Sequence, residues 1–276
     1  MLDRAGTRAP NENGGLGDHA RETYDAFAAY YDEFTAHHDY DGWTTTLEGL
    51  ARSCGMRGRR LLDVACGTGK SFLPYLDRGF EVAACDISQA MVDLAASKAG
   101  NRARLEVCDM RALPRLGEFD LVCCIDDAAN YVLDYDELVS TFAGLARNLA
   151  PGGVVLFDVN SLTAYRTFFA SMSVVVGEER VLVWDGHADE SFDEGDLALA
   201  TVEALNRRED GTWWRDRIVH RQRHHPCATV KRALDAAGLE LRALRGMHLD
   251  GAMTETFAEL ENTKAVYVAQ ARSDKP

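Results

Sequence analysis

The chain has 276 residues, of which 46% are hydrophobic and 27% are charged, and its formal net charge is −14. This composition is typical of a globular protein and excludes collagen-like, coiled-coil and largely disordered chains. A surface this acidic disfavours nucleic-acid binding, because it repels phosphate backbones, and it suits a cationic small molecule.

Targeting signals and cysteines point to the cytoplasm. Residues 1–18 lack the apolar core of a signal peptide and are expected to be a flexible tail. No stretch approaches the ~18 consecutive apolar residues of a membrane span, so no membrane contact is expected. The seven cysteines form no C-x-x-C pair, which disfavours both a zinc site and a disulfide framework. We therefore expect a cytoplasmic protein without a bound metal.

The first elements in chain order are two helices. Aromatic residues recur at three- and four-residue spacing within residues 20–36, which gives a helix one apolar face. A second helix is expected from about residue 42 to residue 54, ending near Gly55.

Strands and helices then alternate between residues 57 and 160. Short apolar runs predict five strands, at Leu61–Val64, Glu81–Cys85, Ala103–Val107, Asp120–Ile125 and Val154–Val159. Intervening helices are expected at 70–78, from after Asp86 to about 98, and at Asp136–Leu149. Such alternation on short connections predicts parallel βαβ units, so this region should be a doubly wound α/β sheet covered on both faces.

The pattern changes after residue 160. Segments 174–185, 197–207 and 212–223 look like strands separated by polar turns, with no helix between them. They predict a small antiparallel insert within residues 161–225 that lies against the main sheet. A helix at Pro226–Ala237 and two strands, at Leu239–Leu244 and Ala265–Ala271, should then complete a mostly parallel seven-stranded sheet within residues 226–272.

The clearest ligand signal is the loop DVACGTG at residues 63–69. Small residues after a first strand let a ligand approach the backbone, and the next helix offers unpaired N–H groups. Ala65 and Phe72 replace glycines of the dinucleotide fingerprint, and the phosphate-loop pattern G-x-x-x-x-G-K-[ST] is missing. An ordinary tight turn is the alternative interpretation.

Acidic residues end the following strands. Asp86 comes after the second strand, Asp109 after the third, and Asp126 and Asp127 after the fourth. In a doubly wound sheet, ligands bind beyond the carboxyl ends of the strands, where these residues should gather. A carboxylate such as Asp86 can accept two ribose hydroxyls; the alternative is a helix N-cap, for which Ser88 competes.

Four stretches that occur in order along the chain resemble those of class I S-adenosylmethionine-dependent methyltransferases. They are LLDVACGTG, EVAACDIS with Met91 following, CDM, and the PGG before the fifth strand. The resemblance covers roughly residues 20–272. It implies a Rossmann-like fold, S-adenosyl-L-methionine as cofactor, and methyl transfer to a small molecule by in-line displacement. It also implies that residues 19–56 form a helical lid, 57–160 the cofactor-binding core, and 161–225 a substrate-side insert.

The resemblance further assigns site residues. The cofactor would be held by Tyr31, Tyr40, Trp43, Asp63, Ala65, Cys66, Gly67, Gly69, Asp86, Ile87, Met91, Asp109, Met110 and Asp126. The catalytic candidates are Tyr131, Asp127 and His37, and the substrate-binding candidates are Tyr24, Asn130, Asn160, Arg223 and His225. Core packing is the alternative for Tyr24 and Tyr31, and an exposed strand end for His225. With an ordinary pKa near 10, Tyr131 suits alignment of a nucleophile better than proton abstraction.

A narrower similarity indicates the chemistry. The stretch IDDAANYVLD and the insert after FDVNS look similar to sugar-amine N-methyltransferases of antibiotic pathways. This favours methylation of an amine nitrogen, with O-methylation as the nearest alternative. A nicotinamide oxidoreductase or a non-catalytic cofactor-binding protein is a remote alternative. The protein is expected to be a monomer or a homodimer.

Overall fold

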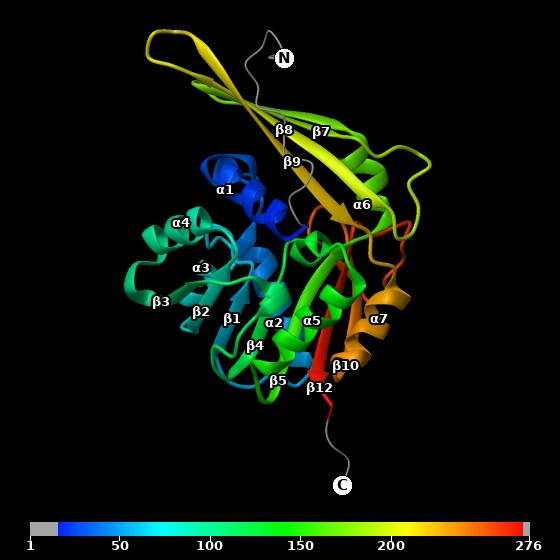
Figure 1. Cartoon of the computed structure of the whole chain (residues 1–276). Helices are drawn as coiled ribbons and strands as arrows, with labels where there is room; N and C mark the ends of the chain where they lie inside the picture. Colours follow the sequence, from blue (N-terminus) through cyan, green and yellow to red (C-terminus); the bar gives the residue numbers. More distant parts are fainter. Residues whose placement is uncertain (1–15, 273–276) are drawn as a thin grey trace.

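The structure, a computed structural model, describes residues 16–272 (Figure 1). The expected tail therefore lies outside the described residues except for residues 16–18, which belong to the first helix. The helices are α1 Leu16–Phe34, α2 Tyr40–Ser53, α3 Leu73–Asp77, α4 Gln89–Ala99, α5 Tyr135–Arg147, α6 Leu162–Thr167 and α7 Cys227–Ala236. No helix among the described residues is both long and apolar enough to span a membrane.

The main sheet runs in the order β11-β10-β12-β5-β4-β1-β2-β3. Its strands are β1 Arg60–Val64, β2 Glu81–Asp86, β3 Ala103–Val107, β4 Phe119–Cys124, β5 Leu149–Asn160, β10 Leu239–Met247, β11 Met253–Thr254 and β12 Lys264–Ala271. The five neighbouring strands β5, β4, β1, β2 and β3 are parallel. Strand β12, in contrast, runs antiparallel to both β5 and β10. The mostly parallel sheet is confirmed, but the count of seven is wrong, because β11 adds an eighth strand too short to show a periodic pattern.

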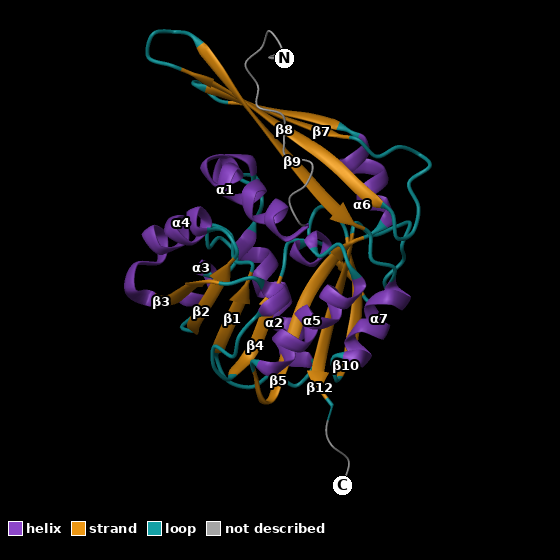
Figure 2. Ribbon diagram, viewed as in Figure 1, coloured by secondary structure: helices purple, strands orange, loops and turns teal. Residues whose placement is uncertain are grey.

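Helices cover both faces of this sheet (Figure 2). On one face, α5 and α7 contribute apolar side chains such as Phe142 and Leu234 to a core with Leu62 and Val64 of β1. On the other face, α2, α3 and α4 pack against the alternate residues of the same strands. Burial on both faces explains why the strands read as nearly continuous apolar runs. The helix expected at 70–78 begins only at Leu73, because residues 68–72 turn around the glycine loop.

The insert is a separate four-stranded antiparallel sheet in the order β6-β7-β8-β9. Its strands are β6 Met172–Val176, β7 Arg180–Gly186, β8 Leu197–Arg207 and β9 Trp213–Arg223. The expected segment 174–185 thus belongs to two strands, β6 and β7, joined by a turn that contains Glu178 and Glu179. The insert does not lie against the main sheet. It stands over the carboxyl ends of the parallel strands, and its inner face packs on Phe27 and Tyr30 of α1, which lies between the two sheets (Figure 1).

Candidate active site

A pocket of about 620 Å³, its open mouth included, lies at the carboxyl edge of the main sheet beside α1. Its wall combines the loops after β1, β2 and β4 with side chains of α1 and α2. The residues predicted from the sequence that line it are Tyr24, Tyr31, Tyr40, Ala65, Cys66, Gly67, Asp86, Ile87, Met110, Asp126 and Tyr131. The lining residues that were not predicted are Ala20, Lys70, Ser71, Ile125 and Ala128.

The glycine loop is shaped to leave room in this pocket. Ala65 and Gly67 both have left-handed φ angles, of 60° and 53°. A Cβ added to Gly67 would project toward the ring of Tyr31, 3.9 Å away, and would occupy space between two parts of the wall. The loop therefore fits a ligand that approaches the backbone closely, as expected.

Asp86 is fixed by backbone amides. Its side chain is 5% exposed, and its two oxygens accept from the N–H groups of Gly67 and Ser88, each at 2.9 Å. Burial raises the pKa of Asp86 to about 6. The N-cap of α4 is Ser88, whose hydroxyl accepts from the Met91 N–H at 3.1 Å. Asp86 is therefore not needed as the cap, and its remaining lone pairs are available to a ligand.

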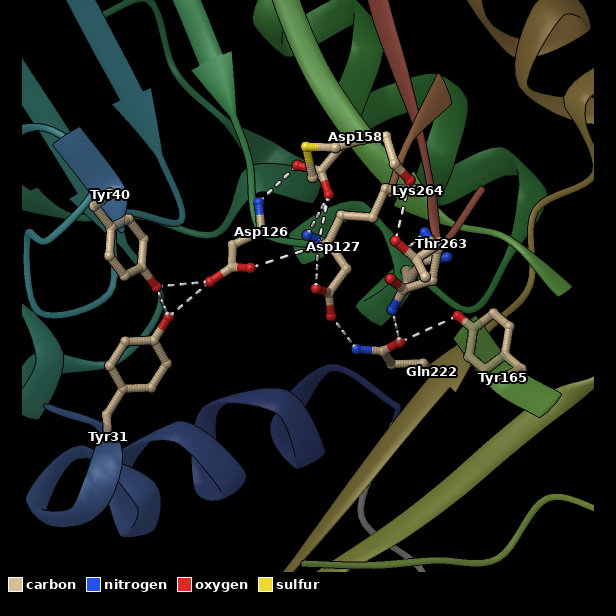
Figure 3. A network of polar contacts seen from close by, with 12 residues as sticks. Tyr31, Tyr40, Asp126, Asp127, Asp158, Tyr165, Gln222, Thr263 and Lys264 are labelled. Atoms are coloured by element: carbon tan, nitrogen blue, oxygen red, sulfur yellow. Dashed lines mark hydrogen bonds and ion pairs between the residues drawn. The ribbon is translucent and has the colours of Figure 1, made fainter. Parts of the chain in front are cut away.

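Asp126 accepts hydrogen bonds from two tyrosine hydroxyls, one on α1 and one on α2 (Figure 3). Tyr40 donates to its Oδ2 at 2.8 Å and Tyr31 donates to the same oxygen at 3.2 Å. Burial acts to raise the pKa of Asp126, but the Lys264 ammonium, His38 and both phenols outweigh it, so the net pKa lies below its ordinary value. Asp126 is thus a carboxylate that stays ionised at the pocket wall.

Lys264, which the sequence analysis missed, lies at the centre of this network (Figure 3). Its Nζ lies 2.6 Å from Asp127 Oδ1, 2.8 Å from Asp158 Oδ2 and 3.4 Å from Asp126 Oδ1. Three carboxylates therefore share one ammonium, which leaves an excess of negative charge beside the pocket. The available signal was a lone lysine opening the otherwise apolar run KAVYVAQA.

Asp127 does not occupy the position expected of a proton acceptor. It is absent from the pocket wall, and its Oδ2 accepts from the Gln222 amide at 2.6 Å while Lys264 holds its Oδ1. Burial raises the pKa of Asp127 above its ordinary value. Because Asp127 does not line the pocket, the structure gives it a role in the network rather than at the reacting group.

Asp63 and Gly69, the two ends of the glycine loop, belong to the expected cofactor set but do not line the pocket. Asp63 is 2% exposed and accepts from the Ser71 hydroxyl, so it supports the loop from below; burial raises its pKa to about 7. A Cβ on Gly69 would come within 2.9 Å of the Phe72 ring, so this glycine is required by packing. Neither Asp63 nor Gly69 is in contact with the pocket.

Three other expected cofactor residues also lie outside the pocket wall. Met91 is fully buried in α4. Asp109 caps a short turn and is paired with the guanidinium of Arg111. The Trp43 ring packs on the core beneath the main sheet, with the Lys264 ammonium 5.8 Å from its centre.

His37 and four expected substrate residues do not reach the pocket either. His37 is exposed and packs on the ring of His38. The other four do not line the pocket, and each of them forms a hydrogen bond with another part of the protein. The contacts are Asn130 Nδ2 to the Arg223 carbonyl, the Asn160 N–H to Asn130 Oδ1, Arg223 to the carbonyls of Leu133 and Gly195, and His225 to the Val132 carbonyl. His225 is 3% exposed, so the exposed strand end considered for it is wrong.

Tyr131 and Tyr24 remain at the wall, with ring centres 5.1 Å apart. The Tyr131 hydroxyl lies 2.8 Å from Nδ1 of His220, a β9 residue that the sequence analysis did not single out. Burial, and next the charge of Asp127, raise the pKa of Tyr131 further above its ordinary value. The phenol therefore stays protonated at neutral pH and suits alignment rather than proton abstraction.

Comparison with known proteins identifies the family. Residues 61–153 match a family described as "Methyltransferase domain". A Bacillus subtilis (strain 168) protein named "Putative methyltransferase YqeM" is 30% identical over 246 residues, which cover 86% of this chain and 94% of that protein. The chain belongs to the class I S-adenosylmethionine-dependent methyltransferases. Its cofactor is S-adenosylmethionine, which supplies the transferable methyl group on a sulfonium.

Two further proteins resemble this methyltransferase. The dTDP-4-amino-2,3,4,6-tetradeoxy-D-glucose N,N-dimethyltransferase of Saccharopolyspora spinosa is 34% identical over 110 residues, covering 40% of this chain and 43% of that protein. The sugar N-methyltransferase KedS8 from Streptoalloteichus sp ATCC 53650 aligns with a TM-score of 0.71 and 25% identity, covering 97% of this chain and 100% of that one.

Proposed function

We propose that this methyltransferase transfers its methyl group to an amine nitrogen of a small, sugar-like molecule. The observation that carries the proposal is that the pocket-wall groups are poor bases toward a hydroxyl: within residues 16–272 no histidine lines the pocket, Tyr131 is held protonated, and Asp126 has a lowered pKa. A carboxylate with a lowered pKa is a counter-ion for cationic groups and a poor base. The similarity to sugar-amine N-methyltransferases supports the same substrate class.

Within the pocket, we assign the residues by their chemistry. Asp86 would accept the ribose hydroxyls, and Ile87 and Met110 would flank the adenine. Asp126 would hold the ammonium of the methionine portion, near the sulfonium, where its charge is most useful. Residues 19–56 would close over the cofactor, and the insert within residues 161–225 would shape the substrate side.

Methylation of a neutral amine needs little beyond alignment, because its lone pair is already available. Methylation of a hydroxyl needs a base that touches the substrate. Within residues 16–272, no histidine lines the pocket, Tyr131 is held protonated, and Asp127 faces its own partners. In this proposal Tyr131 aims the amine, and solvent takes the proton released after transfer.

The proposal predicts which nucleophile accepts the methyl group. We would assay amino sugars, free and dTDP-linked, against matched sugars that carry a hydroxyl at the same carbon. We expect release of S-adenosylhomocysteine and a mass gain of one or two methyl groups with amines, and no turnover with the matched alcohols. Preferential methylation of the alcohols would contradict amine methylation and leave the enzyme an O-methyltransferase.

A further inference from the structure

His220 lies behind Tyr131, in a buried aromatic box between α1 and the insert. The residue belongs to β9 and is 1% exposed. Its ring centre lies 4.9 Å from that of Phe27, 5.6 Å from that of Trp184 and 6.1 Å from that of Tyr24. The rings of Phe27 and Tyr24 stand nearly perpendicular to it. His220 does not line the pocket, so its influence on a bound substrate would pass through Tyr131.

Only one nitrogen of His220 has a polar partner. Nδ1 lies 2.8 Å from the Tyr131 hydroxyl, whereas Nε2 is buried with no hydrogen-bond partner among the described residues. Burial lowers the pKa of His220 to about 3, so the ring is neutral at physiological pH and carries one proton, on either nitrogen. The position of that proton decides which way the Tyr131 hydroxyl points.

The two tautomers have opposite consequences for the pocket. With the proton on Nε2, Nδ1 accepts from the Tyr131 hydroxyl, and the phenol oxygen, which also faces the side chains of Tyr24 and Gln222, acts toward the pocket as an acceptor only. With the proton on Nδ1, the phenol is the acceptor there, and its own O–H would turn toward the pocket. That O–H would bind the lone pair of an incoming amine, which is the electron pair needed for attack.

The aromatic box favours the first arrangement. The faces of aromatic rings carry negative charge density, so they attract an N–H and repel a nitrogen lone pair. A neutral imidazole enclosed by Phe27, Trp184 and Tyr24 therefore gains by placing its N–H, rather than its lone pair, at the nitrogen that has no polar partner. That nitrogen is Nε2.

We propose that His220 is a positioning residue: its Nδ1 accepts the Tyr131 hydroxyl proton and thereby presents the phenol oxygen as an acceptor to the substrate's amine N–H. This inference rests on the proposed amine methylation, because an acceptor at this place holds an N–H while leaving the nitrogen lone pair directed at the methyl carbon.

The first test needs no substrate. We would record the imidazole nitrogen signals of the ¹⁵N-histidine-labelled protein, assign His220 from its loss in His220→Asn, and compare wild type with Tyr131→Phe. We expect the neutral tautomer with the proton on Nε2 between pH 6 and 8, and a shift of the Nδ1 signal in Tyr131→Phe. A proton on Nδ1 would overturn the proposal.

The second test is a double-mutant cycle, run on whichever compound of the assay panel is methylated. We expect Tyr131→Phe and His220→Phe each to lower kcat about tenfold, and the double variant to be no slower than the slower single variant. His220→Asn, which keeps an acceptor near the Nδ1 position, should recover most of the loss. Losses that multiply to about a hundredfold would show that the two residues act independently, against the proposal.

Controls separate this proposal from folding effects and from the proposed function. His187→Phe removes an exposed histidine of the same insert and should leave kcat within twofold. Affinity for S-adenosylhomocysteine should be unchanged in every variant that keeps the pocket intact. If the product carries its new methyl on oxygen, amine methylation fails, while the tautomer and the cycle still report on His220.

Discussion

Lys70 is the positive side chain of the pocket wall, near the turn that carries the glycine loop. Its ammonium donates to the carbonyl of Thr35 at 2.8 Å and to the Thr35 hydroxyl at 2.9 Å. An ammonium has three N–H groups, so one remains for a ligand. With Asp126 as the anionic side chain expected at the methionine end, the pair is suited to a zwitterion, whose carboxylate would go to Lys70.

Lys70→Met should therefore weaken binding of S-adenosylmethionine by about 2 kcal/mol, the scale of a hydrogen bond between charged groups. Decarboxylated S-adenosylmethionine lacks the carboxylate and should bind wild type and variant equally. Titration calorimetry with both ligands measures the difference. If the variant loses the same affinity for both, Lys70 acts on the shape of the loop rather than on the carboxylate.

At the residue scale, the sequence revealed what is local. Gly67, Asp86 and Asp126 lie at or within a few residues of the ends of buried strands, and strand ends of a doubly wound sheet meet at one edge. Lys264 and His220 were missed because their partners lie far away in the chain: Lys264 meets Asp127 across 137 positions, and His220 meets Tyr131 across 89. No local pattern reveals such pairs.

At the scale of elements, α1 is the bridge between the two sheets. Its Asp25 accepts from the Ser88 hydroxyl at 2.5 Å, and its Asp32 accepts from the Thr68 hydroxyl at 2.6 Å. These contacts fasten the helix to the loops after β2 and β1, on either side of the pocket. Because Tyr24 and Tyr31 of the same helix form part of the wall, we expect α1 to move when the cofactor exchanges.

Residues 20–45 should therefore exchange backbone amide hydrogens more slowly when S-adenosylhomocysteine is bound. The ligand would contact the wall that α1 completes and so disfavour its opening. Hydrogen exchange with mass spectrometry measures the change, with α7, on the outer side of the main sheet, as the internal reference. Identical protection of residues 20–45 with and without ligand would mean that α1 is not a lid.

The elements differ in how far the sequence predicted them. Strands β1 to β4 and β8 were predicted almost to the residue, since each is a clear apolar or alternating run, whereas β5 begins at Leu149 rather than at the predicted Val154. Helix α6 and strand β11 were missed because six and two residues are too few to establish a period. The alternating pattern of the insert shows that one face of its sheet is buried, but not which element packs on that face. In the structure that element is α1 rather than the main sheet.

At the scale of the whole molecule, the Lys264 network joins parts that are distant in the chain. Lys264 opens the last strand, Asp127 follows β4, and Asp158 lies on β5. Gln222 connects Asp127 to the insert. The N–H groups of Asp126 and Asp127 also donate to the Asp158 carboxylate, at 2.6 and 2.9 Å. Asp126 and Asp127 have left-handed φ angles of 65° and 53°, and these two hydrogen bonds hold them in that conformation. The charge at the site and the closure of the fold thus depend on the same contacts.

Lys264→Met should lower the free energy of unfolding by about 3–5 kcal/mol, because it leaves buried carboxylates without their counter-ion. In wild type, burial lowers the pKa of Lys264, but the three carboxylates outweigh it and the net pKa is raised. Lys264 therefore stays charged from pH 5 to pH 8, well below its unfolded pKa of about 10.4.

In the Lys264→Met variant, the pKa values of Asp126 and Asp127 should rise on folding, because the ammonium that lowers both is gone. The folded variant then binds more protons than its unfolded chain, so its stability falls as the pH rises. The gap between wild type and variant should therefore be wider at pH 8 than at pH 5. Urea unfolding at both pH values measures it, with Lys231→Met, an exposed lysine of α7, as the control expected to change stability by less than about 0.5 kcal/mol. A gap that stays constant or narrows at pH 8 would show that Asp126 and Asp127 do not depend on Lys264 for their charge.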